Sequence, residues 1–287
     1  MSKGRPVAVA NASSGMQVAS LLAVRVGCEF VYDADAPTPA VLLVRPDPRD
    51  HRVRKETWTI SPPTPHHDYR DLYGNVCRRF TFTPGVTTLR YDAHVQVLPT
   101  PADTNWEAPE LPVERLPDEA LVYTLPSRYC LSDQLGDRAW ELFGGVEPGW
   151  NRVQAICDWV HDNIGFAYGT SRPDTTAVDV LNAGKGVCRD FAQVAISFCR
   201  ALNIPARYAF GYLPDIGVPP PDAAMDFCAW FEAYLGDRWW TFDPRNNARR
   251  IGHIVIARGR DALDVAMVTT YGTAKLESMT VWADHVP

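Results

Sequence analysis

A cysteine that follows a glycine-flanked loop is the residue of this 287-residue chain best suited to nucleophilic chemistry. The stretch Gly186-Val187-Cys188-Arg189-Asp190-Phe191 places Cys188 where a helix is expected to begin. Unpaired backbone N–H groups and the positive end of a helix favour a thiolate at that point. The same N–H groups can stabilise a developing oxyanion. Position alone leaves a buried structural cysteine open as the alternative, the role that we assign to Cys199 inside the same expected helix.

The periodicity around Cys188 predicts the elements that must hold it. Apolar residues recur at helical spacing until Pro205, which ends the helix: Val187, Phe191, Val194, Phe198 and Leu202. Two further helices are expected upstream, over 151–164 and 176–182. Strands are expected downstream, over 206–212, 227–235 and 239–242, with a tight turn at Gly236-Asp237. Helices followed by antiparallel strands indicate an α+β unit.

The first third of the chain has a different pattern. From Leu21 to Leu98 short alternating runs are interrupted by prolines, and no helical periodicity is present. This pattern predicts an N-terminal antiparallel β-sandwich over residues 18–99. A proline-rich linker is expected over 100–126, and the α+β unit over 127–287.

Composition narrows the class of protein. The formal net charge of −6 argues against a general nucleic-acid binder. No apolar run is long enough to span a bilayer, so no membrane partner is expected. The seven cysteines form no CxxC pair, and no export signal is recognised, which predicts reduced thiols in the cytoplasm. Neither a metal nor a cofactor is predicted, and oligomeric state stays open.

Several separated motifs carry a resemblance to a known family. They are Gly186–Ala192, Ala201–Tyr208, Asp226–Glu232 and Arg238–Asp243. In order and spacing they resemble the core of the bacterial transglutaminase-like superfamily, and the β segment before them is similar to the region that often precedes this core. The resemblance implies a papain-like arrangement with a cysteine on a helix and a histidine and an aspartate on neighbouring strands. Cys188 then matches the nucleophile and Asp243 the orienting carboxylate.

The chain departs from the family pattern at the general base. It reads Cys228-Ala229-Trp230 where active hydrolases and acyl transferases of the family read His-Ala-Trp. Strand alternation puts Cys228 and Trp230 on one face, so Cys228 is expected to point where an imidazole would. A positioned acid or base contributes typically about 10²–10⁴-fold, so amide hydrolysis should be slow and thioester chemistry less affected. No other histidine is expected to substitute, and His253 is interpreted as a surface residue on a turn.

The main hypothesis is a cysteine-dependent acyl-group enzyme, a peptidase, amidase or acyl transferase acting on a peptide or amide-containing substrate. Its degenerate triad would be Cys188, Cys228 and Asp243. The alternative is a catalytically inactive peptide-binding or scaffold protein of the same superfamily. A third interpretation is redox: Cys188 and Cys228 could form a reversible disulfide, or hold a zinc ion with Asp243, although three ligands leave zinc incomplete. Substrate identity, and hydrolysis against transfer, stay open.

Overall fold

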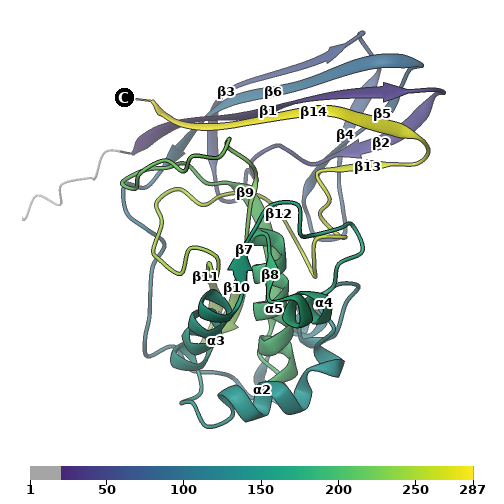
Figure 1. Ribbon diagram of the computed structural model, residues 1–287. Coiled ribbons are helices and arrows are strands. Elements are labelled where there is room, and N and C mark those ends of the chain that lie inside the picture. Colours follow the sequence, from purple (N-terminus) through teal and green to yellow (C-terminus); the bar gives the residue numbers. More distant parts are fainter. Residues whose placement is uncertain (1–20, 287) are drawn as a thin grey trace, which may run out of the picture.

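The computed structural model describes residues 21–286, so residues 18–20 of the expected sandwich lie outside the described residues. Figure 1 shows two units, with β-sheets above and a helix-covered sheet below. Within the described residues the strand pairs are antiparallel except for one short two-stranded sheet. The predicted α+β class is therefore confirmed.

The upper unit consists of two four-stranded sheets, ordered β14-β1-β6-β3 and β13-β2-β5-β4. Its strands are β1 (Leu22–Ala34), β2 (Thr38–Leu42), β3 (Arg52–Ser61), β4 (His66–Arg70), β5 (Val76–Phe82), β6 (Gly85–Val97), β13 (Val268–Thr270) and β14 (Ala274–Val286). Along β6, buried and partly exposed residues alternate, as a strand with one core-facing side requires. The apolar alternation seen in the sequence thus forms one wall of the sandwich.

Two strands of the sandwich come from the end of the chain. Strand β14 pairs along β1, with Val281 opposite Cys28, and β13 pairs with β2. The expected boundaries assigned residues 127–287 to the second unit, and the structure corrects this for 268–286. Without β14, one edge of the long strand β1 would present unpaired N–H and C=O groups.

The segment 100–126 is packed against the second unit. It contains three short helices: η1 (Val113–Arg115), α1 (Asp118–Leu121) and η2 (Val122–Thr124). Ala120 is fully buried, and the carbonyl oxygens of Ala108 and Pro109 accept hydrogen bonds from Trp150 and Gly236 of the lower unit. The proline-rich stretch is therefore an ordered strap and not the plain linker that the sequence predicted.

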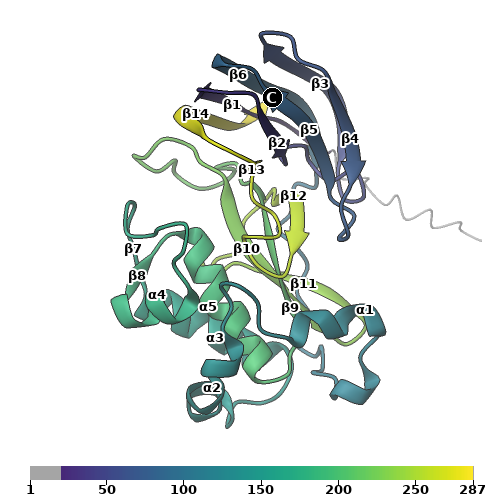
Figure 2. The same cartoon turned by 90° about the vertical axis from the view of Figure 1, so that its right-hand side faces the viewer.

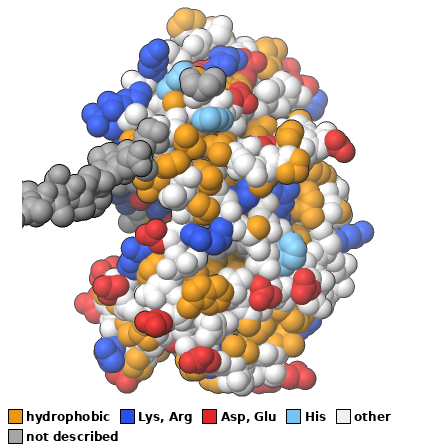
Figure 3. Space-filling model, turned by 90° about the vertical axis from the view of Figure 1, so that its left-hand side faces the viewer, with side chains coloured by type: hydrophobic (Ala, Val, Ile, Leu, Met, Phe, Trp, Pro, Cys, Tyr) orange, Lys and Arg blue, Asp and Glu red, His pale blue; other side chains and the backbone are white. Residues whose placement is uncertain are grey.

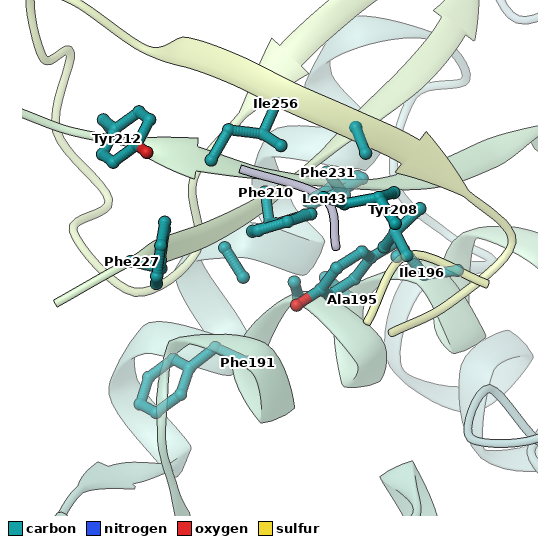
Figure 4. Close-up of a cluster of buried hydrophobic side chains, with 14 of the residues drawn as sticks. Leu43, Phe191, Ala195, Ile196, Tyr208, Phe210, Tyr212, Phe227, Phe231 and Ile256 are labelled. Atoms are coloured by element: carbon teal, nitrogen blue, oxygen red, sulfur yellow. The ribbon is translucent and has the colours of Figure 1, made fainter. Parts of the chain in front are cut away.

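The lower unit places helices on an antiparallel sheet ordered β11-β10-β9-β12. Its helices are η3 (Ser132–Gln134), α2 (Gly136–Phe143), α3 (Trp150–Asn163), α4 (Ala177–Ala183) and α5 (Cys188–Ala201). Its strands are β7 (Gly165–Phe166), β8 (Lys185–Gly186), β9 (Ala206–Tyr212), β10 (Cys228–Leu235), β11 (Arg238–Phe242) and β12 (Ile254–Gly259). Figure 4 shows Phe191 and Ala195 of α5 on the same side of the sheet as Phe210 and Phe227. This packing holds the first turn of α5 beside the start of β10.

A buried ionic network joins the two units. The Glu232 carboxylate on β10 accepts hydrogen bonds from Arg207 at 2.6 Å and from Arg258 on β12 at 2.8 and 2.9 Å. Arg258 also donates to Asp50 of the sandwich at 2.5 Å. Next to it, the Val255 N–H donates to Nε2 of a sandwich histidine, His51, at 2.8 Å. Figure 2 shows β12, an edge strand of the core sheet, below the sandwich with which these contacts form.

One face of the molecule carries side chains of every kind (Figure 3). On the face in Figure 3, acidic and basic side chains are interspersed with apolar ones. Among the helices of residues 21–286, none has the length and apolar character needed to span a bilayer.

Candidate active site

Cys188 is the first residue of α5, as predicted, and a buried carboxylate fixes the start of this helix. The Asp190 Oδ2 atom accepts the backbone N–H of Val187 at 2.8 Å, and Oδ1 accepts the Ser171 hydroxyl at 3.0 Å. A Cβ atom at Gly186 would come within 2.7 Å of the Asp190 Cβ, which explains the glycine before the helix. The loop that presents the Cys188 thiol is thereby held in one conformation.

The Cys188 thiol lies against the start of β10. Its Sγ is 3.8 Å from the carbonyl oxygen of Phe227, and the side chain packs on a small apolar cluster that includes Cys228 and Trp230. A hydrogen bond from the Cys228 thiol lowers the pKa of Cys188 and, with the Ala229 N–H, outweighs the raising effect of burial. The same interaction, together with burial, raises the pKa of Cys228. The first proton lost by the pair therefore comes from Cys188.

The other cysteines are poor nucleophiles. Burial raises the pKa of Cys28 and Cys130 to about 12, that of Cys77 to about 11, and those of Cys157 and Cys199 further. All seven cysteines of the chain lie in its described part, and Cys188 alone is partly exposed. It also alone has a lowered pKa, so the structure distinguishes it from the structural cysteines. Cys199 is fully buried, in agreement with the structural role predicted for it.

Asp243 follows β11 and is occupied by donors other than the cysteines. Its Oδ2 accepts hydrogen bonds from Nε2 of His253 at 3.2 Å and from the Asn246 side-chain amide at 2.6 Å. Its Oδ1 accepts a hydrogen bond from the Asn246 backbone N–H at 3.0 Å. Burial acts to raise the pKa of Asp243, but these hydrogen bonds outweigh it and the pKa is lowered. The carboxylate is close enough to Cys228 to disfavour a negative charge on that sulfur.

His253 is not the surface residue that the sequence predicted. Its side chain is 10% exposed, and its ring packs edge-to-face on Trp230 with centroids 4.8 Å apart. It lines two pockets that exclude Cys188. The chain therefore holds a histidine–aspartate pair, but the imidazole packs on Trp230 and does not line either pocket that contains Cys188. Nine residues of irregular chain lie between Asp243 and His253, and no periodic pattern there signals the contact.

Two pockets open on the Cys188–Cys228 pair. The smaller, of about 130 Å³, is lined by Tyr168, Asp226 and Arg245 among others. Tyr168 is 56% exposed. Arg245 acts to lower the pKa of Cys188 and Asp226 acts to raise it. Arg245 was not among the site residues expected from the sequence, and the structure places it in the pocket with the thiol.

The larger pocket, of about 580 Å³, lies between the two units. Its core side includes Tyr208, Phe210 and Phe227, and its sandwich side includes Phe30 of β1 and Met279 of β14. The volume falls in the usual range for small-molecule or peptide side-chain sites. Because β14 comes from the end of the chain, the sequence did not predict this wall.

The zinc interpretation does not agree with the structure. Over residues 21–286, no group of three or more His, Cys, Asp or Glu side chains is arranged to hold a metal ion. Cys188 and Cys228 interact, but the Asp243 oxygens are bound to His253 and Asn246. The three residues are thus neighbours without a common coordination centre.

Comparison with known proteins agrees with this architecture. Residues 137–244 match the family model of the transglutaminase-like superfamily. The crystal structure of a "putative cysteine protease" from Cytophaga hutchinsonii is 31% identical, with a TM-score of 0.82 over 93% of this chain and 92% of that chain. The chain belongs to the transglutaminase-like superfamily. The matched core contains Cys188, Cys228 and Asp243, and the structural match extends over the sandwich as well.

Relatives of this superfamily member also occur in mycobacteria. An uncharacterized protein of Mycobacterium leprae is 28% identical over 83% of this chain and 88% of its own length. An uncharacterized protein of Mycobacterium tuberculosis is 29% identical over 80% of each chain. These relatives are bacterial, and the matches to them extend over both structural units.

Proposed function

We propose that this protein is a cysteine-dependent acyl-group enzyme in which the Cys188 thiolate attacks a carbonyl carbon. The observation that carries the proposal is the difference among the seven cysteines. Cys188 alone combines a position at a helix start, partial exposure, a lowered pKa and an opening into two pockets. A structural cysteine requires none of these features, whereas each of them favours a reactive cysteine.

The chemistry follows from the groups around the sulfur. Attack forms a thioester between Cys188 and the acyl group, and the leaving group departs with its electron pair. Water or an amine then takes the acyl group and releases the thiolate. The Cys228 thiol stabilises the thiolate by its hydrogen bond, but it cannot become the cation that protonates an amine leaving group. Thioesters and activated esters, whose leaving groups need little proton assistance, are therefore the favoured substrates over amides.

The larger pocket supports an acyl group with a bulky apolar side chain, such as a peptide residue. Aromatic side chains of β9 and of the chain before β10 form its floor, and Met279 of the sandwich faces them across it. An acyl carbon at the Cys188 sulfur would leave its side chain next to these groups. The sandwich would then contribute to substrate selection as well as to folding.

A paired-substrate assay tests the proposal. Acetyl p-nitrophenyl ester and acetyl p-nitroanilide carry the same acyl group and differ in the leaving group. The wild type should release nitrophenol from the ester with a burst equal to the enzyme concentration and should act on the anilide far more slowly. Cys188→Ser should abolish the burst, and Cys199→Ser is the matched control for loss of a buried thiol.

The alternative is a binding protein that has lost its chemistry. The observation that favours this alternative is that Asp243 is hydrogen-bonded to His253 and not to a base next to Cys188. This alternative expects a saturable peptide affinity, no burst, and alkylation of Cys188 by iodoacetamide no faster than that of the other cysteines. Rapid selective alkylation without any burst would likewise reject the enzymatic proposal, because the nucleophile would be intact and unused.

A further inference from the structure

Two cysteines lie at the site, and they differ in exposure to solvent. The proposed acyl chemistry uses only one of the two sulfurs as a nucleophile. Cys188 is partly exposed, and Cys228, which is 8% exposed, lines the same two pockets. The Cys188 Sγ is 3.8 Å from the carbonyl of Phe227, the residue that precedes Cys228, and the two side chains pack in one cluster. The Cys188 side chain is therefore the more accessible to a small solute, and the Cys228 side chain packs in the same cluster.

Both cysteines lie at the ends of their elements. Cys188 is the first residue of α5 and Cys228 the first residue of β10, so each is preceded by irregular chain or a short strand. A disulfide requires an S–S distance of about 2.05 Å and Cα atoms within about 7 Å. Because both cysteines lie at element ends, a disulfide between them involves the first residue of the helix and the first residue of the strand, and not the interior of either element.

A second cysteine pair provides an internal contrast. Cys157 on α3 and Cys199 on α5 also interact, but their exposed fractions are 1% and 0%. The two cysteines are neighbours in both pairs, but solvent reaches only the pair that contains Cys188. Only the Cys188–Cys228 pair joins an accessible sulfur to a second sulfur within reach.

We propose that Cys188 and Cys228 form a peroxide-oxidised dithiol that closes reversibly to a disulfide. The Cys188 thiolate attacks one oxygen of a hydroperoxide, the O–O bond breaks, and the alcohol or water leaves after taking up a proton. Cys188 is then a sulfenic acid. The Cys228 sulfur attacks it, the S–O bond breaks, and the departing hydroxide takes the Cys228 proton to leave as water. The two thiols lose two electrons in total, and the peroxide gains them; an external dithiol reverses the change.

The disulfide would switch off the proposed acyl chemistry, because it consumes the nucleophile. The residue at the general-base position then has a role that histidine could not fill. The inference uses the Cys188 thiolate but does not require that the protein transfers acyl groups. Its test can therefore fail or succeed independently of the ester assay.

The experiment treats the reduced full-length protein with one equivalent of hydrogen peroxide and then measures intact mass and free thiols after unfolding. We expect a loss of two hydrogen atoms, a decrease from seven titratable thiols to five, and a cross-linked peptide pair containing Cys188 and Cys228. Dithiothreitol should restore all thiols. Cys228→Ser should stop at a sulfenic acid that dimedone traps, and Cys157→Ser should behave as the wild type.

Two results would overturn the inference. One is a Cys188 that reacts with iodoacetamide in the reduced protein but gives no cross-link to Cys228 under peroxide. The other is a cross-link at Cys157 and Cys199 in place of the proposed pair. In either case the ester assay remains a separate measure of acyl chemistry. Conversely, a disulfide in a protein without an ester burst would leave this inference standing and remove the acyl proposal.

Discussion

Replacing Glu232 by Gln should destabilise the protein through the junction between its two units. The Glu232 side chain is 5% exposed and accepts hydrogen bonds from both Arg207 and Arg258. Burial acts to raise its pKa, yet the two arginines lower it from 4.5 to about 2. A difference of about 2.5 units at 1.36 kcal/mol each is worth about 3 kcal/mol of folding stability. Breaking a buried ion pair independently costs about 3–5 kcal/mol, so the two figures agree.

The sign of the pH dependence follows from the lowered pKa. The contribution of Glu232 is fully present above its unfolded pKa of 4.5 and fades as pH falls toward about 2. Urea unfolding followed by fluorescence should therefore show a wild-type advantage of about 3 kcal/mol at neutral pH. This advantage should shrink by more than about 1 kcal/mol at about pH 3.5.

A surface pair is the matched control for this experiment. Glu277 is bonded to Lys275, and their side chains are 42% and 77% exposed, so Glu277→Gln should change stability by less than about 1 kcal/mol. The reasoning is refuted if Glu232→Gln behaves like this control. It is also refuted if the wild-type advantage is the same at both pH values, because the loss would then be one of packing and not of charge.

Four further changes test the site and its support. Cys228→Ala should move the midpoint of Cys188 alkylation by iodoacetamide to higher pH, and Cys228→Ser, which keeps a donor, should not. Cys228→His should raise anilide cleavage by about 10²–10⁴-fold and ester cleavage less; an equal gain on both substrates would contradict the leaving-group argument. His51→Gln should remove a loss of stability that the wild type shows as pH falls from about 6.5 to about 4, because burial lowers the pKa of His51 to about 4. Met279→Glu should slow alkylation of Cys188 by a phenylalanine-derived chloromethyl ketone while leaving the iodoacetamide rate unchanged.

Local pattern was sufficient to predict the elements that carry the nucleophile. The apolar spacing after Cys188 predicted a helix that ends before Pro205, and the structure has α5 over Cys188–Ala201. The strand predicted over 206–212 coincides with β9, and the one predicted over 227–235 differs from β10 by one residue. These elements are encoded by residues a few positions apart, where side-chain periodicity reports directly on the buried face.

Long-range pairing could not be predicted in the same way. Strand β14 joins β1 across more than two hundred residues, with Ala274 opposite Ala34 at one end of the ladder. Its alternation would suit an edge position in either unit, so the sequence does not specify the partner. The wall that Met279 contributes to the larger pocket depends on this pairing and was missed with it.

Because Asp243 is paired with His253, the presence of this aspartate does not by itself indicate a catalytic triad. The Asp243 side chain is only 4% exposed. A carboxylate as buried as this destabilises the fold unless it is hydrogen-bonded. His253 and Asn246 meet that requirement without any group at position 228. Asp243 can therefore persist for structural reasons, and its position beside the site is weak support for catalysis. Cys188 has no such structural explanation, because a thiol needs neither partial exposure nor a hydrogen-bonded thiolate to pack well. The distinction between an enzyme and a scaffold consequently depends on the reactivity of this one sulfur.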